Sequence, residues 1–308
     1  MTSPTNPCRM SLLKKFAAYL EYLAIRFLGM FYGLVPASRA YDLGARLTAL
    51  AYPLFTARRR TAVENILKAH ITDDPDEADR IARQAFGHLA GHLCESLKAG
   101  NVISDETWRD HITLDGPAES FALLLESPGV PILILTGHLG AWESAVPILS
   151  RARPMIAVAR TLNNPFVERF LKRHHFRGQI TIIPKKKGFS PDVLRAWKNQ
   201  GAAMTLVMDQ HASPKQGVTV DFLGRPASTH TSPARLHLQT GAPILVGGFM
   251  REGPFRYRMV TGLPIRFQPT ENREADVRAL TAEINARLGE VIRRYPEQYL
   301  WAHKRWRV

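Results

Sequence analysis

From about residue 113 onward, the sequence alternates short, branched apolar segments with longer amphipathic ones, and this alternation restricts the fold more than any other feature. The strands that we expect from this alternation lie at 131–136, 155–160, 180–183, 203–208, 218–222, 243–250 and 256–263. The helices that we expect lie at 142–150, 164–176, 190–200, 233–240 and 272–294. Strands that alternate with helices are typical of a largely parallel sheet covered on both faces. We therefore predict an α/β fold with a mostly parallel central sheet flanked by helices.

The residues before this alternation are predicted to be helical. The exception is residues 1–10, which we expect to form a Pro- and Ser-containing leader. Residues 11–112 are predicted to form an amino-terminal helical region. Within that region, the polar and acidic residues Thr72–Glu77 predict the start of a helix that runs to about Ala99. No linker long enough to separate two domains appears, so we expect the helical region and the α/β core, residues 113–308, to form one continuous domain.

The most apolar part of the helical region runs from Phe16 to Val35 and contains only two charges, Glu21 and Arg26. About 20 residues suffice to span a hydrocarbon core, but a charge at its centre costs roughly 2.5–3.5 kcal/mol. Two lysines precede this stretch, as suits an anionic membrane surface. We predict a membrane-associating helix at about 12–35 that lies at the interface or spans it marginally. A cleaved signal peptide and the core helix of a soluble protein remain alternatives.

The chain is strongly basic, with 41 Lys and Arg against 27 Asp and Glu and a formal net charge of +14. Such a surface favours polyanions, whether nucleic acid, an anionic membrane, or an acidic carrier or substrate. Composition alone does not rank these partners. The two cysteines, Cys8 and Cys94, are too few for a disulfide framework, which favours a reducing compartment.

His138 and Glu143 follow the predicted strand 131–136 directly and stand five positions apart. Open α/β folds build their ligand sites at the carboxyl ends of strands. A histidine titrates near neutrality and can take a proton from a hydroxyl, while a nearby carboxylate can fix its tautomer and stabilise the imidazolium. We therefore interpret His138 as a candidate general base with Glu143 as its partner. The alternative is a helix-capping histidine, with Glu143 on a solvated face.

Other polar groups also follow predicted strands. Asp209 and Gln210 close the strand at 203–208, so they could share the crevice of His138. Arg225 lies in a Gly-Arg-Pro turn, where its guanidinium suits a phosphate or a carboxylate. Taken singly, each of these features is equally typical of a turn or a helix cap.

Three adjacent lysines, Lys185, Lys186 and Lys187, follow the predicted strand 180–183. They could meet phosphate groups or the acidic helix of a carrier protein. The alternative is a solvated loop with no ligand.

The sequence lacks the glycine-rich dinucleotide and P-loop motifs, the G-x-S-x-G elbow and H-E-x-x-H. His88, His92 and Glu95 fall on one face of a predicted helix and could hold zinc. Surface or subunit packing is the alternative for these three residues, and we predict no metal.

The spacing His138-x4-Glu143 resembles the first signature of the glycerolipid-type acyltransferases, H-x4-D/E. Further residues are similar to the lipid A late (lauroyl/myristoyl) acyltransferase branch, which also contains the mycobacterial phosphatidylinositol mannoside acyltransferases. These further residues are Arg59-Arg60, Asn65, Arg160, Asp209-Gln210, Gly217-Val218, Phe222-Leu223-Gly224-Arg225-Pro226-Ala227, Thr229, Pro233-Ala234-Arg235, Thr240-Gly241-Ala242-Pro243 and Pro296-Glu297-Gln298-Tyr299-Leu300-Trp301. The branch often has an aromatic residue after the histidine and Asn before Trp-Glu, where this chain has Leu139 and Ala141. This departure leaves open the pocket wall, the acyl length and the acceptor.

The resemblance covers nearly the whole chain and implies an α/β acyltransferase that uses no cofactor and no metal. It implies an acyl carrier protein or acyl-CoA as donor and a lipid A precursor or similar glycolipid as acceptor. It places the enzyme at the cytoplasmic face of a bacterial inner membrane, against an anionic membrane surface and without nucleic acid.

The resemblance also implies roles for individual residues. His138 would deprotonate the acceptor hydroxyl and Glu143 would orient His138, whereas the role of Asp209 stays open. The candidates for binding substrate are Arg160 and Arg225 for acceptor phosphate or donor, Gln210 beside Asp209, and Lys185 and Lys186 for the donor's phosphopantetheine.

Three alternatives remain at this point. The acceptor could be a lysophospholipid or an ornithine lipid, or the enzyme could be a thioesterase that uses water. A non-enzymatic basic module bound to membrane or nucleic acid would also fit the charge, and a steep salt dependence of nucleic-acid binding would reveal it.

Overall fold

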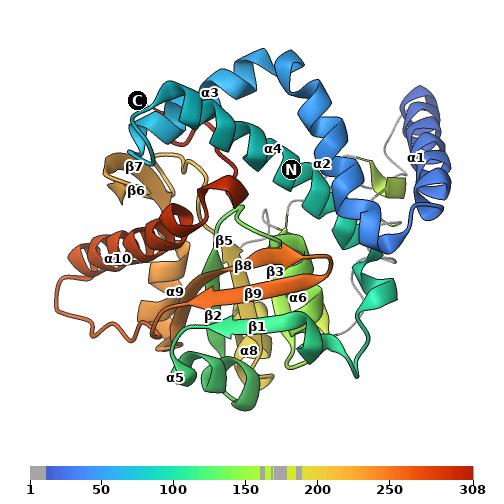
Figure 1. The fold of residues 1–308 in the computed structure, drawn as a ribbon. Coiled ribbons are helices and arrows are strands. Elements are labelled where there is room, and N and C mark those ends of the chain that lie inside the picture. Colours follow the sequence, from blue (N-terminus) through green and yellow to red (C-terminus); the bar gives the residue numbers. More distant parts are fainter. Residues whose placement is uncertain (1–11, 160–163, 168, 170–178, 185–188, 308) are drawn as a thin grey trace.

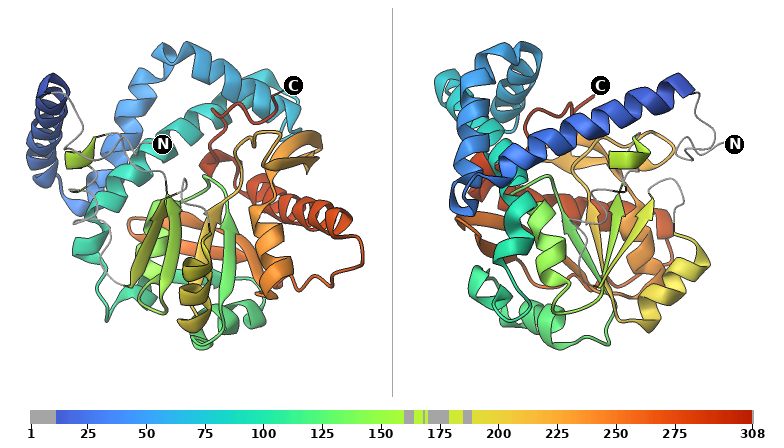
Figure 2. Two further views of the ribbon diagram at one scale, coloured as in Figure 1. Left: turned by 180° about the vertical axis from the view of Figure 1, so that it is seen from behind. Right: turned by 90° about the vertical axis from the view of Figure 1, so that its right-hand side faces the viewer.

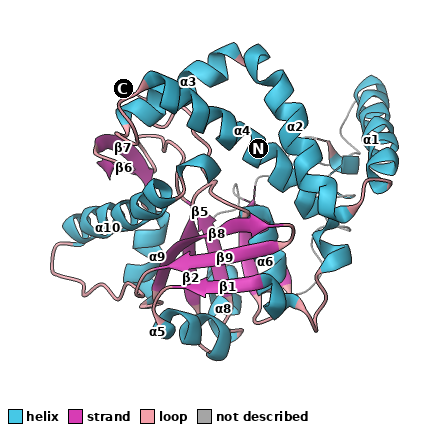
Figure 3. Ribbon diagram, in the orientation of Figure 1, coloured by secondary structure: helices cyan, strands magenta, loops and turns pink. Residues whose placement is uncertain are grey.

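A seven-stranded, mostly parallel sheet forms the centre of the molecule (Figures 1 and 3). The computed structural model describes residues 12–159, 164–167, 169, 179–184 and 189–307. In spatial order the strands are β1 (Ile112–Asp115), β9 (Arg256–Thr261), β8 (Ile244–Gly253), β2 (Ile132–Thr136), β5 (Ala203–Val207), β3 (Met155–Ala159) and β4 (Ile180–Pro184). The predicted α/β class with a mostly parallel sheet is therefore confirmed.

Strand β2 lies at the middle of the sheet and explains why the sequence signal there was so clear. It pairs in parallel with β5 on one side and β8 on the other, and all five of its residues are buried. Its side chains alternate between two hydrophobic clusters: Leu133 and Leu135 in one, Ile132 and Ile134 in the other. Because both faces of the strand are covered, its sequence is a continuous apolar run.

Helices cover both faces of the sheet. The cluster around Ile132 includes residues of α5 (Ala118–Phe121), the following π-helical turn and α6 (Trp142–Leu149). The cluster around Leu133 includes residues of α8 (Pro191–Asn199), α9 (Ser232–Thr240) and α10 (Arg273–Arg294). The predicted helix at 164–176 lies in part outside the described residues.

Three features of the sheet region differ from the prediction. Strand β9 runs antiparallel to β8, and β1, which was not predicted, adds to it in parallel. The predicted strand at 218–222 forms, as β6 (Gly217–Phe222), but it pairs with β7 (Arg225–His230) in a separate hairpin. Strand β7 was missed because Arg225, Pro226 and its polar residues are typical of a turn.

The predicted amino-terminal helices are α1 (Leu12–Gly33), α2 (Ala40–Ala51), α3 (Thr56–Lys68) and α4 (Pro75–Val102). Figure 1 shows α2, α3 and α4 arching over one end of the sheet. Glycines allow α2 and α4 to touch, since a Cβ at Gly44 would lie 2.6 Å from the Ala90 carbonyl oxygen. The helical region thus packs directly on the α/β core.

Helix α1 crosses above the strand ends in the right-hand view of Figure 2. Asn164 holds it there, with its Nδ2 donating to the Ala18 carbonyl at 2.8 Å and to the Glu21 carboxylate at 2.9 Å. The large apolar side chains that α1 exposes are Phe16, Tyr19, Leu20, Leu23, Phe27, Met30 and Phe31.

Within the described part of the chain, no single helix has the length and apolar character needed to cross a bilayer. The pair Lys14–Gly33 and Ala37–Leu54 meets those criteria only when taken together, and its two helices are bent by 110°.

Candidate active site

The loop after β2 carries His138, and glycines give this loop its shape. Gly140 has φ +62°, a conformation that residues with a side chain rarely adopt, and a Cβ there would lie 2.4 Å from the Phe249 carbonyl oxygen. A Cβ on Gly137 would lie 3.3 Å from the Cβ and Cγ of Asp209. A side chain at Gly140 is therefore excluded, and one at Gly137 would press on Asp209, so the two glycines let the loop place His138 close to that carboxylate.

His138 and Asp209 form a hydrogen-bonded pair at the ends of two neighbouring strands. Thr136 of β2 stands opposite Val207 of β5, so the residues two positions further along also lie side by side. The His138 Nδ1 lies 2.9 Å from Asp209 Oδ1, and the His138 backbone N–H donates to Asp209 Oδ2 at 3.0 Å. This carboxylate is buried, whereas the His138 side chain keeps 24% of its surface exposed.

The Asp209 carboxyl is ionised, which fixes the histidine tautomer. Burial alone would raise the pKa of Asp209, but the hydrogen bonds and charge of His138 outweigh it and hold that pKa below its usual value. An ionised carboxylate only accepts hydrogen bonds, so the His138 Nδ1 must carry a proton. The lone pair of the neutral imidazole is then on Nε2, which is the nitrogen able to take a proton.

Glu143 lies in the first turn of α6, and the hydrogen-bond partner of its carboxylate differs from the one that we expected. The sequence assigned the orientation of His138 to Glu143, whereas in the structure the carboxylate on the His138 Nδ1 belongs to Asp209. The Trp142 indole N–H donates to Glu143 Oε1 at 3.2 Å. Glu143 retains exposed surface, but loss of water around its carboxyl raises its pKa, while the hydrogen bond from Trp142 and the charge of His138 oppose that rise. Glu143 therefore contributes to the electrostatic field of His138.

Trp142 connects His138 to an apolar cavity inside the core. Its ring meets the His138 ring edge-to-face, with centroids 5.4 Å apart. Beyond Trp142 lies a narrow, partly open cavity of about 40 Å³. Its lining residues are Ile134, Thr136, Trp142, Ala145, Val146, Leu149, Met155, Thr205, Leu245, Gly247, Gly248, Phe249, Met259, Val260 and Thr261. Because most of these side chains are apolar, the cavity has the character of a hydrocarbon site, and it would have to widen to take a whole acyl chain.

The remaining candidate residues are spread over the molecule. Gln210 follows Asp209 directly and is partly exposed. Arg225 is exposed and pairs with Phe222 beside the turn of the β6–β7 hairpin. This turn is the end of the hairpin that lies further from Asp209. Arg160, Lys185 and Lys186 lie outside the described residues.

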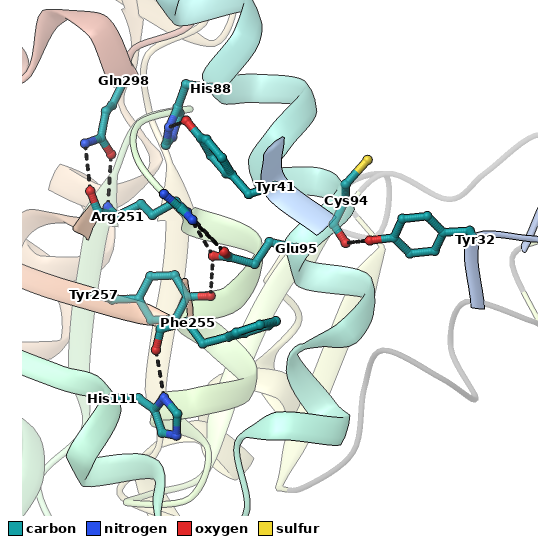
Figure 4. A network of polar contacts seen from close by, with 10 residues as sticks. All are labelled: Tyr32, Tyr41, His88, Cys94, Glu95, His111, Arg251, Phe255, Tyr257 and Gln298. Carbon is teal, nitrogen blue, oxygen red and sulfur yellow. Dashed lines mark hydrogen bonds and ion pairs between the residues drawn. The ribbon is translucent and has the colours of Figure 1, made fainter. Parts of the chain in front are cut away.

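The histidines of α4 serve packing in the described structure. Burial lowers the pKa of His88 to about 4 and that of His92 to about 3, so both rings are neutral at pH 7. Glu95 binds Arg251 and Tyr257 instead of a metal (Figure 4). Among the described residues, no three His, Cys, Asp or Glu side chains are grouped so that they could hold a metal ion.

Sequence reasoning missed the contribution of the carboxyl-terminal segment, where His303 lies close to the pair. The His211 backbone N–H donates to His303 Nε2 at 3.3 Å, and burial lowers the pKa of His303. The only available signal was the unexplained cluster of aromatic and basic residues at 299–307. That cluster does not indicate that His303 contacts His211, which lies almost 100 positions earlier in the chain.

Comparisons with known proteins show the family of this chain. Residues 9–308 match the family model described as bacterial lipid A biosynthesis acyltransferase. The lipid A biosynthesis palmitoleoyltransferase of Escherichia coli (strain K12) is 24% identical over 268 residues, which cover 86% of this chain and 84% of that protein. The lipid A biosynthesis acyltransferase of Shigella flexneri is similar to the same extent. Because the family model matches nearly its whole length, this chain belongs to the bacterial lipid A biosynthesis acyltransferases.

Proposed function

We propose that this acyltransferase moves a fatty acyl group from an acyl thioester to a hydroxyl group of a lipid A precursor or similar glycolipid. The observation that carries the proposal is the His138–Asp209 pair, which lies beside an apolar cavity bordered by Trp142. One half of the site can remove a proton, and the other half can hold a hydrocarbon chain. A transfer between a fatty thioester and an alcohol needs both.

In the proposed reaction, His138 Nε2 takes the proton of the acceptor hydroxyl as its oxygen attacks the thioester carbonyl carbon. The new C–O bond forms, the C–S bond breaks, and the imidazolium returns the proton to the leaving thiolate. Asp209 stabilises the imidazolium through Nδ1, and Glu143 adds negative charge nearby. A general base of this kind contributes typically about 10²–10⁴-fold to the rate.

The apolar cavity is proposed to hold the acyl chain. Its lining residues Trp142 and Leu149 stand seven positions apart on α6, which corresponds to about 10 Å along the helix axis. The chain would enter beside Trp142 and extend toward Leu149, leaving the thioester near His138. Either an acyl carrier protein or acyl-CoA could present such a chain.

Positive side chains and one amide, that of Gln210, are proposed to hold the phosphate groups of donor and acceptor. Arg160, Lys185, Lys186 and Gln210 follow strands that end on the same side of the sheet as His138. Arg225, near the turn of its hairpin, is proposed to meet a phosphate at the outer margin of the binding surface.

The enzyme is proposed to work at the cytoplasmic face of a bacterial inner membrane, with α1 lying against the bilayer. The exposed aromatic and aliphatic side chains of α1 support this placement. Amphipathic helices with this pattern bind at the boundary between headgroups and acyl chains.

The test combines purified enzyme, acyl thioester and lipid A precursor, and measures product by mass spectrometry and thiol release by absorbance. We expect His138→Ala to abolish transfer while fold and membrane binding persist. The matched control is His70→Ala, since His70 is exposed and remote from the loop. Substantial transfer by His138→Ala contradicts the base assignment. Thiol release without acceptor favours a thioesterase, and product with only lysophospholipid or ornithine lipid corrects the acceptor.

A further inference from the structure

An open groove of about 490 Å³ lies between α2 and α4, and we call it the α2–α4 groove. It shares no lining residue with the apolar cavity beside Trp142, so it is a separate site. Its volume falls within the range of roughly 300–1,000 Å³ that is typical of ligand pockets. The charged residues that line it are three arginines, Arg46, Arg83 and Arg251, and one acid, Glu297. This excess of positive charge favours an anionic ligand.

Two of the three arginines are available to a ligand. The Arg251 guanidinium is already paired with the Glu95 carboxylate at 2.9 Å. Arg46 and Arg83 are exposed, and neither forms an ion pair within the part of the chain that the structure describes. Arg83 donates to a backbone carbonyl, that of Ala49, at 3.3 Å. Because a guanidinium offers several donors in a planar fork, both side chains keep donors that match phosphate oxygens.

One wall of the groove is held in place by its own contacts, and Figure 4 shows the four residues that form it. The Tyr41 hydroxyl lies 3.2 Å from His88 Nδ1, and the Arg251 guanidinium carbon lies 3.5 Å from the centre of the Tyr41 ring. Gln298 Oε1 accepts from the Arg251 backbone N–H at 3.0 Å, and Gln298 Nε2 donates to the Arg251 carbonyl at 3.1 Å. A wall that is fixed before binding reduces the entropy lost when a ligand enters.

Helix α2 carries large apolar side chains next to the groove. Leu50 follows Arg46 by four positions, so the two stand about 40° apart around the helix axis. Leu47, Leu50 and Leu54 are all exposed, and Leu50 keeps 78% of its surface in contact with solvent. Only residues 34–39 separate α2 from α1, which exposes apolar side chains of its own. A large exposed apolar surface beside a basic groove is typical of a lipid-binding face.

We propose that the α2–α4 groove binds the phosphate-bearing headgroup of an anionic membrane lipid, whose acyl chains lie along the exposed leucines of α2. Arg46 and Arg83 bind the phosphate oxygens, and the exposed amide of Gln84 offers a further donor. A soluble phosphate compound would leave the leucines in water, whereas a lipid covers them. The site contains none of the residues assigned to acyl transfer, so the inference goes beyond the proposed function and does not rest on it.

The experiment measures by flotation how the full chain partitions onto two kinds of phosphatidylcholine vesicle. One kind carries phosphatidic acid, and the other carries oleate to the same zeta potential. The ratio of the two partition coefficients therefore removes the general attraction between a basic protein and a negative surface. Because hydrogen bonds to charged groups are strong, we expect the native chain to prefer phosphatidic acid by about 10-fold. Equal partition of the native chain onto both vesicles overturns the proposal.

The groove variant combines Arg46→Gln with Arg83→Gln and should abolish this preference. The matched control combines Arg273→Gln with Arg278→Gln on α10, which removes the same charge. Both control arginines are exposed, and Arg278 donates to a backbone carbonyl, that of Thr219, at 2.7 Å, as Arg83 does on α4. We expect the control to keep the native preference. A preference that survives in the groove variant, or that disappears equally in the control, overturns the proposal.

Calorimetric titration with inorganic phosphate separates a lipid headgroup from a free anion. Phosphate binding that is lost in the groove variant, together with equal partition onto both vesicles, would assign the groove to a soluble anion and overturn the lipid proposal. Should the groove variant not fold, Gln84→Glu decides by the same ratio, because it adds a carboxylate to the groove at an exposed position. A native preference in folded Gln84→Glu overturns the proposal. Since no measurement needs acyl transfer, failure of this inference stays distinct from failure of the proposed reaction.

Discussion

Two carboxylates lie buried near the catalytic loop, and their partners give them different tasks. Glu95 of α4 binds the Arg251 guanidinium at 2.9 Å and the Tyr257 hydroxyl at 3.0 Å (Figure 4). Asp209, after β5, binds the His138 imidazole at 2.9 Å and accepts a second hydrogen bond from the His138 backbone N–H at 3.0 Å. Both carboxylates are at most 2% exposed.

The two pairs differ in the basic side chain that the carboxylate binds. A guanidinium keeps its proton in proteins, so the Glu95–Arg251 pair can only hold α4 to the end of β8. Arg251 is further fixed by the Tyr41 ring, 3.5 Å from its guanidinium carbon. An imidazole gains and loses a proton near neutral pH, so the Asp209–His138 pair can take part in a reaction. Under the proposed function, a buried acid takes part in catalysis only where its partner can titrate.

The largest effect should come from Asp209→Asn. An amide at this position would favour the wrong tautomer of His138, and in His–Asp pairs this change costs on the order of 10⁴-fold in turnover. We expect a fall of about 10³–10⁴-fold in kcat, with a thermal unfolding temperature close to that of the native chain. Steady-state acyl transfer and thermal unfolding measure the two quantities. Near-native turnover would mean that Glu143 orients His138 after all.

For Glu95→Gln we expect the opposite pattern, a large loss of stability with a small loss of turnover. Removing one charge of a buried pair leaves Arg251 uncompensated, which destabilises proteins by about 3–5 kcal/mol. Urea unfolding should show this loss, whereas kcat per folded molecule should fall far less than in Asp209→Asn. If Glu95→Gln instead removed turnover and left stability intact, the contrast between the two carboxylates would be wrong.

The sequence indicated both residues of the His138–Asp209 pair but not their pairing. His138 and Asp209 each follow a short, largely apolar strand, which is a local signal. Their contact depends on β2 and β5 being neighbours, although 71 positions separate the two residues. Glu143 was favoured because proximity in sequence was the only measure available for a histidine partner. The register Thr136–Val207 decided the question in favour of Asp209.

The same limit explains the other differences. Strand β1 has only four residues and a mixed burial pattern, so its sequence carries little periodicity. Strand β7 has to pair with β6 across the two-residue turn Leu223–Gly224, where both residues have positive φ. Leucine is an unusual residue for that conformation, and the turn could not be recognised from it. The role of Asn65 was equally hidden, since its partners are the distant Trp301 and His303.

A smaller effect should separate His138 from the histidines of α4. His92 is buried, and neither of its ring nitrogens has a hydrogen-bond partner among the residues that the structure describes. Since burial lowers its pKa from 6.5 to about 3, the unfolded chain binds a proton that the folded chain does not. The stability from this group is complete above pH 6.5 and falls by about 1.4 kcal/mol per unit as the pH drops toward 3.

His92→Phe keeps a ring beside Trp142 and removes this titration. Between pH 6.5 and 4, its unfolding free energy should therefore decline less steeply, by about 1.4 kcal/mol per pH unit. Urea unfolding at a series of pH values measures the slope. An identical slope in both proteins would show that His92 takes up its proton without loss of structure.

The smallest effect concerns chain length and tests whether the cavity beside Trp142 serves the reaction. Val146 lines the cavity about one helical turn beyond Trp142, so Val146→Phe should fill its middle and exclude the far end of a long chain. Each buried methylene contributes about 0.8 kcal/mol, so losing two should shift the preference in kcat/KM toward shorter chains by roughly 10-fold. Competition between acyl thioesters that differ by two carbons, read by mass spectrometry, measures the ratio. Val130→Phe is the matched control, because Val130 is exposed and does not line the cavity. Unchanged selectivity in Val146→Phe would show that the acyl chain binds elsewhere. The proposed role of His138 and Asp209 would then stand, but without this cavity as the acyl site.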